Sequence, residues 1–184
     1  MTFFLKLKHW QLFGLLLGIP MLFQFVTVST FIKSENILTL LSILSVVMVI
    51  TMCIFLAWFY SLGTNLHKKL PPTVSMNLTL FKILLLFPLL YLVSITVFML
   101  TMLPTLGVGS RPNFLPFSAI FVVHFFSMFC IFYCLYFNAK ALKSVEWQKP
   151  VTFGDFAGEF FLIWFFPIGV WILQPRINEL FKED

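Results

Sequence analysis

The polar side chains that could do chemistry in this sequence are few, and they fall inside long apolar stretches. His124 is the only ionisable residue deep in such a stretch, and an ionisable group inside a membrane is costly and usually functional. Four other features fall at a similar depth, counted from the predicted helix ends: Gln24, Ser45, Thr96 and a helix break at Pro167. We therefore predict a polar layer in the outer leaflet, able to hold waters or a small ligand.

This predicted layer also has a simpler interpretation. Its members would form ordinary hydrogen bonds between helices, each worth about 0.6 kcal/mol on average. At about 100° per residue, His124 shares a weakly polar helix face with Ser127 and Asn138, beside a ridge of aromatic side chains. Both interpretations turn this face into the bundle.

The other reactive residues lack the spacing that catalysis or metal binding requires. Cys130 and Cys134 do not form the C-x-x-C of a redox pair, and no second intramembrane histidine is present to bind haem. Asp155 and Glu159 are explained as residues at the start of a helix, where its dipole favours negative charge. Zinc motifs, phosphate loops and nucleophile elbows are absent from the sequence. We expect no catalytic residues, no metal and no cofactor.

The elements that position these residues must be membrane helices. Of 184 residues, 60% are hydrophobic and 10% are charged, whereas soluble domains carry roughly 25% charged residues. The longest polar stretch, residues 64–77, is too short to fold alone. We expect an all-α, polytopic integral membrane bundle that forms a single domain over residues 1–184.

Apolar stretches of about 20 residues each can cross a membrane. They predict five helices, at about residues 10–32, 37–62, 79–103, 116–138 and 153–174. Thr152 and Asp155 are spaced as a capping box that starts the last helix near Phe153, and Pro175 is expected to end it.

The last predicted helix allows two topologies. Its uncharged part, residues 160–173, is about 21 Å long, shorter than the hydrocarbon core of about 30 Å, and Pro167 interrupts it. We favour a kinked fifth crossing that leaves the C-terminus outside. The alternative is four crossings plus a re-entrant or interfacial segment.

The net charge of +5 indicates an orientation rather than a nucleic-acid partner, because the lysines sit in pairs at the ends of apolar runs. Loops rich in Lys and Arg alternate with poor ones, and the third loop carries Arg111 alone. This alternation predicts a cytoplasmic N-terminus. The basic, apolar beginning continues to Ile32 without a small-residue cleavage site, which favours an uncleaved first helix.

The C-terminal stretch FPIGVWILQPRIN resembles the ends of small uncharacterised bacterial polytopic membrane proteins, which share the pattern F-P-I-G-x-W-x-x-Q-P-R-I-N. The resemblance covers only the end of the chain. It implies the bacterial cytoplasmic (inner) membrane, and it brings no activity.

Two groups of residues near this end are candidate contact sites. Gln174, Arg176 and Asn178 are expected to form a polar cluster where the helix leaves the membrane, contacting lipid headgroups or another subunit; simple interfacial anchoring is the alternative. Gly154 and Gly158 have the small-xxx-small spacing that lets another helix approach closely, although Gly154 can equally belong to the preceding loop.

These features leave three functional classes open. The first is a non-catalytic subunit, scaffold or accessory factor that acts through helix–helix contacts with another membrane protein or with copies of itself. The second is a self-assembling pore or small transporter, which requires a more continuous polar stripe than the helix at 116–138 provides. The third is a lipid- or quinone-binding protein that uses the polar layer. Membrane lipids are expected as surroundings in all three, and nucleic acid in none.

Overall fold

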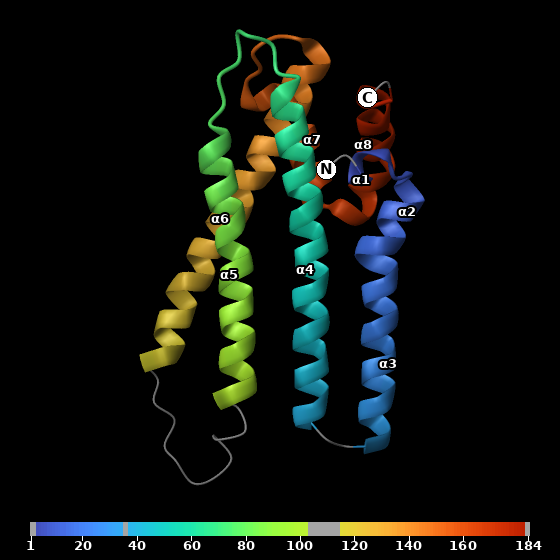
Figure 1. The fold of residues 1–184 in the computed structure, drawn as a ribbon, viewed down its shortest axis with the longest axis vertical. Helices are drawn as coiled ribbons and strands as arrows, with labels where there is room; N and C mark the ends of the chain where they lie inside the picture. The colour runs from blue at the N-terminus through green and yellow to red at the C-terminus, as the bar shows by residue number, and fades with distance from the viewer. Residues whose placement is uncertain (1–2, 35–36, 103–114, 183–184) are drawn as a thin grey trace.

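The computed structural model describes residues 3–34, 37–102 and 115–182, which are almost entirely helical and contain no strand. In chain order the elements are α1 (Phe3–Lys6), α2 (His9–Phe13), the π-helical turn η1 (Gly14–Gly18), α3 (Ile19–Ser34), α4 (Ile37–Lys68), α5 (Leu78–Met102), α6 (Leu115–Trp147), α7 (Phe153–Trp164) and α8 (Phe166–Leu180). The long helices α3, α4, α5 and α6 lie side by side, with the short helices gathered at one end of them (Figure 1). The all-α prediction is confirmed.

Four stretches are long and apolar enough to cross a membrane: His9–Ile32, Thr39–Lys68, Leu78–Thr101 and Ser118–Trp147. They confirm the first four predicted helices, although the loop with Arg111 and the predicted end at residue 103 lie outside the described residues. Two helices are longer than expected. α4 continues past 62 and α6 past 138, because buried side chains such as Leu66 and Leu142 keep the helical spacing and pack onto the short helices.

The C-terminal segment is a bent pair of helices. α7 and α8 meet at an angle of 120°, and Phe165 between them has φ −86° and ψ 55°, outside the helical region. Pro167 therefore lies in the first turn of α8, where a missing N–H costs no helical hydrogen bond. A Cβ on Gly169 would overlap the backbone of Leu162, so only glycine lets the two helices approach this closely.

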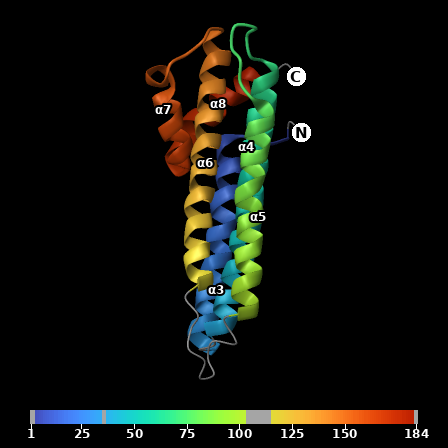
Figure 2. The same cartoon turned by 90° about the vertical axis from the view of Figure 1, so that its left-hand side faces the viewer.

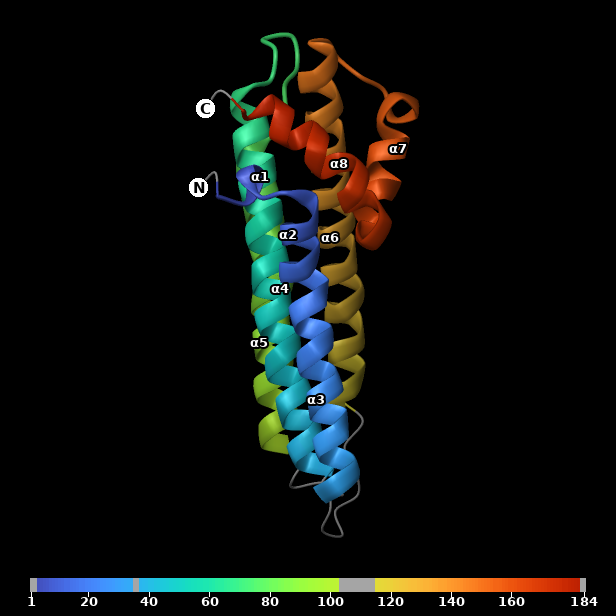
Figure 3. The ribbon, with the colours of Figure 1, turned by 90° about the vertical axis from the view of Figure 1, so that its right-hand side faces the viewer.

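This hairpin returns toward the end of the bundle from which it starts, and both chain termini lie there (Figures 1 and 3). The geometry matches the re-entrant alternative, and the count of five crossings holds only if the bent pair is one broken span. The expectation that the C-terminus lies opposite the N-terminus is wrong for this arrangement. Pro175 does not end the helix either, since α8 continues through it to Leu180.

The apolar core is concentrated at the end of the bundle where the short helices pack. Trp58 and Phe59 of α4 and Phe81 of α5 are almost completely buried there, and the Phe81 ring stacks on Phe137 of α6 with 4.3 Å between centroids. The opposite half of the four long helices exposes large apolar side chains instead. Such a surface is suited to hydrocarbon rather than water.

Among the glycines, Gly63 rather than the predicted pair allows a close approach of helices. Gly154 and Gly158 are exposed, and a Cβ at either would meet nothing within 4 Å. The prediction that they pack against another helix is therefore wrong within this chain. At Gly63 a Cβ would lie 2.5 Å from the Phe81 ring and 2.8 Å from the Asn138 amide oxygen, and both residues are fully buried.

We predict that Gly63→Ala lowers the free energy of unfolding by about 1–3 kcal/mol, because the methyl group overpacks a core with no room to shift. Denaturation in detergent, followed by circular dichroism, measures the change. Gly154→Ala and Gly158→Ala are the matched controls and should be neutral or slightly stabilising, since Ala favours helix and meets open space. Equal stability of all three variants would contradict the close crossing.

Candidate functional site

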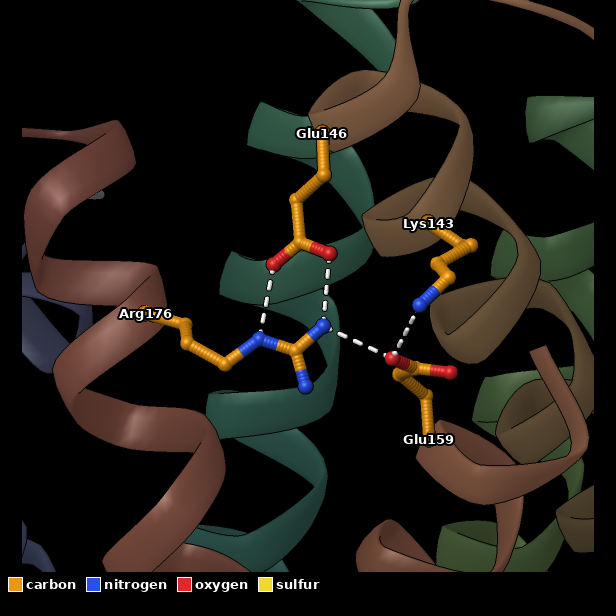
Figure 4. A network of polar contacts seen from close by, with 4 residues as sticks. All are labelled: Lys143, Glu146, Glu159 and Arg176. Carbon is orange, nitrogen blue, oxygen red and sulfur yellow. Dashed lines mark hydrogen bonds and ion pairs between the residues drawn. The ribbon is translucent and has the colours of Figure 1, made fainter. Parts of the chain in front are cut away.

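A network of four charged side chains joins the last three helices (Figure 4). Arg176 of α8 donates two hydrogen bonds to Glu146 of α6, from Nε to Oε1 at 2.9 Å and from Nη2 to Oε2 at 2.6 Å. The same Nη2 donates to Oε1 of Glu159 in α7 at 2.7 Å. Lys143 of α6 donates to that oxygen as well, at 2.9 Å. Two cations and two carboxylates leave the network without net charge.

Glu159 is the most deeply placed member of this network, with its side chain 6% exposed. A carboxylate removed from water is stable only if it is well paired, because desolvation is costly. Lys143 and Arg176 approach it from two different helices, which supplies that pairing. The interpretation of Glu159 as an ordinary helix-start residue is therefore wrong.

Asp155, one turn earlier on α7, fits its predicted role. The backbone N–H and the hydroxyl of Thr152 both donate to Asp155 Oδ2 at 2.7 Å. This confirms the capping box and the start of the helix at Phe153.

The opposite face of α8 holds the N-terminal segment. Gln174 Nε2 donates to the carbonyls of Phe4 and Leu7, both at 2.9 Å. Asn178 Nδ2 donates to the carbonyls of Leu5 and Leu7, at 2.5 and 3.0 Å. The carbonyls at the end of a helix lack partners within it, so these two amides satisfy the end of α1 and tie it to α8.

The three predicted residues of the Q-P-R-I-N stretch thus form two separate contacts. Arg176 pairs with carboxylates on α6 and α7, while Gln174 and Asn178, four residues apart on one helix face, bind α1. We expected contacts with headgroups or another subunit, and the structure shows contacts within the chain. The sequence analysis did not identify Lys143 and Glu146 as members of this site. The signal that could have pointed to them is a Lys and a Glu three residues apart in one helix.

His124 lies exposed on the chain's surface, within the span Ser118–Trp147. Its Nδ1 is 3.2 Å from the hydroxyl of Tyr91 on α5. The neighbouring Phe121 and Phe125 are 64% and 51% exposed, because the α7–α8 hairpin covers only the other half of α6 (Figure 2). The sequence interpretation turned His124 into the bundle, and that part of it is wrong.

The other members of the predicted polar layer lie apart from His124. Ser45 donates to the carbonyl of Leu41 in its own helix at 2.8 Å, Gln24 is exposed on α3, and Thr96 is half-buried on α5.

Pro167 lies near the tip of the hairpin. Trp164, at this tip, packs on Phe132 of α6 with 4.9 Å between the ring centroids. Phe132 lies about 12 Å along α6 from His124. Contacts among the described residues do not join the five into one layer.

We predict that Asn178→Asp releases the N-terminal segment, because a carboxylate cannot donate to the carbonyls of Leu5 and Leu7. In a variant without native cysteines, a cysteine in place of the buried Leu5 should react with maleimide about tenfold faster than it does in the same variant with Asn178. A tenfold change corresponds to a loss of about 1.4 kcal/mol of hydrogen-bond stabilisation. Asn77→Asp is the control, since Asn77 accepts from the N–H of Leu80 and Asp retains that acceptor. Equal labelling rates in both variants would contradict the clamp.

We predict that Glu159→Gln destabilises the chain by about 3–5 kcal/mol, because it leaves Lys143 and Arg176 with a single carboxylate between them. Denaturation in detergent measures the loss, and adding Lys143→Gln should recover part of it by restoring charge balance. Glu179→Gln, at an exposed position on α8, is the control. A loss no larger than that of the control would show that the network does not hold the hairpin.

Side chains that could hold a metal do not cluster in the described ranges: no three of His, Cys, Asp or Glu come close enough there. Comparisons with protein-family models, with curated proteins and with solved structures find no match to this chain. A functional interpretation therefore rests on the contacts of the chain itself.

Proposed function

We propose that this chain is a non-catalytic integral membrane protein that acts through helix–helix contacts, as a subunit, scaffold or accessory factor. The observation that supports this proposal is the Tyr91–His124 pair, in which His124 is exposed and Tyr91 is half-buried. Tyr91 lies near the middle of the span Leu78–Thr101, about 20 Å from its first residue and about 15 Å from its last at 1.5 Å per residue. A polar pair at that depth faces hydrocarbon unless another helix covers it.

Polar groups inside a membrane almost always face protein or a water-filled cavity. In this chain the other described helices do not cover His124, and the surrounding surface of α6 is aromatic. A helix from another protein or a second copy, packed on this surface, would exclude lipid from the pair and provide further hydrogen-bond partners.

The buried charges support the non-catalytic part of the proposal. The charged side chains of the network pair with one another: Lys143, Glu146, Glu159 and Arg176. This pairing holds the fold together, and each of the two carboxylates has a cation as its partner. We place the chain in the bacterial inner membrane, which the resemblance of its C-terminal stretch implies. We place both termini in the cytoplasm, because the lysine-bearing α1, end of α4 and end of α6 lie at one end of the bundle (Figure 1).

Photo-crosslinking in native membranes tests the proposal. Benzoylphenylalanine in place of Phe125, beside His124, should give a discrete adduct with a protein, either a second copy or another membrane protein. The same group in place of Phe25 on α3, which is 71% exposed, is the control and should give lipid adducts only. His124→Leu should reduce the protein adduct at 125 severalfold, since it removes the polar contact.

Identical lipid adducts at both positions would contradict a covering helix. A protein adduct that His124→Leu leaves unchanged would mean that the aromatic surface, rather than the polar pair, directs the contact. That result would overturn the proposed role of Tyr91 and His124.

A further inference from the structure

A second surface of the chain, between α4 and α5, has the shape and charge of a ligand site. A groove of about 550 Å³ lies there, within the range of small-molecule pockets. Its walls are mostly apolar and include Leu56, Ala57, Leu85 and Leu86. Between Lys82 and Leu89 it follows α5 for about 10 Å. An apolar channel of this length inside a membrane span fits the upper part of a hydrocarbon chain.

One end of the groove carries a cation. Lys82 lies in the second turn of α5, exposed, with its Nζ 5.9 Å from the centre of the Tyr60 ring. No carboxylate pairs with Lys82 among residues 3–34, 37–102 and 115–182. An apolar groove that ends at a lysine without a carboxylate partner complements a molecule with a hydrocarbon chain and an anionic head.

From this arrangement we infer that the α4–α5 groove binds one anionic phospholipid, with an acyl chain along the apolar walls and the phosphate at Lys82. Basic pockets between membrane helices are known to select anionic headgroups, and the aliphatic stem of a lysine can lie along apolar surface while its ammonium group reaches the interface. A transmembrane helix of a partner would cover the same walls but would leave Lys82 without a counter-charge. The inference goes beyond the proposed function, because the groove is separate from the Tyr91–His124 surface and either can fail alone.

Native mass spectrometry tests this inference. The purified chain, reconstituted in nanodiscs of equal parts phosphatidylglycerol and phosphatidylcholine, should retain one phosphatidylglycerol when released into the gas phase. Lys82→Gln should abolish the preference for phosphatidylglycerol, lowering its retention at least fivefold. Ala57→Phe should fill the groove and remove both lipids.

Two matched variants keep the test specific. Lys140→Gln removes another lysine that lies over a tyrosine ring, that of Tyr136, and Ala119→Phe enlarges an exposed alanine on α6; both should retain the lipid. Retention unchanged by Lys82→Gln, retention unchanged by Ala57→Phe, or equal retention of the two lipids by the unaltered chain would each overturn the inference. So would the finding of a second copy of the chain in place of lipid.

Discussion

The ion pair between Glu159 and Arg176 is the constraint on which the C-terminal architecture depends. The two residues are 17 apart in the chain, so a straight helix would separate them by about 25 Å. They can touch only if the chain folds back between them, and the break at Phe165 does this. Pairing of the buried carboxylate with Arg176 therefore requires the chain to fold back between α7 and α8. A straight fifth crossing would leave Glu159 without Arg176, at a considerable cost in desolvation.

The hairpin in turn organises the whole end of the molecule. Once α8 folds back from α7, its other face meets α1, and Gln174 and Asn178 satisfy the carbonyls there. Lys69 at the end of α4 donates to the carbonyl of Leu180 at 2.7 Å, which joins a third segment to the same helix. The N-terminal segment is thus held to the C-terminal helix by two side chains of α8. We expect this end to open last, because local stability follows buried contacts and hydrogen bonds.

The predictable parts of the structure are those that depend on local sequence. Hydropathy located four spans, and the capping box located the start of α7, because both signals lie within a few residues of the feature they specify. The turn at Phe165 depends instead on the pairing of Glu159 with Arg176, 17 residues later in the chain, and on the close approach of Gly169 to Leu162. The short uncharged stretch at 160–173 was the local sign that this segment folds back. The helical wheel placed His124, Ser127 and Asn138 on one face of α6, but it could not say which positions along that face other helices cover: Ser127 and Asn138 are buried, whereas His124 is exposed.

Paired charges and an exposed histidine divide the molecule into two halves of different character. Near the termini, the charged side chains of Lys143, Glu146, Glu159 and Arg176 pair with one another, so their charges balance within the chain. In the other half His124, hydrogen-bonded to the half-buried Tyr91, lies exposed on an apolar surface. A bilayer cannot replace the missing neighbours, because hydrocarbon neither donates nor accepts hydrogen bonds. Gln174, Arg176 and Asn178 therefore hold one end of the molecule together through contacts within the chain, whereas the helix contact that we propose belongs to the far half of α5 and α6.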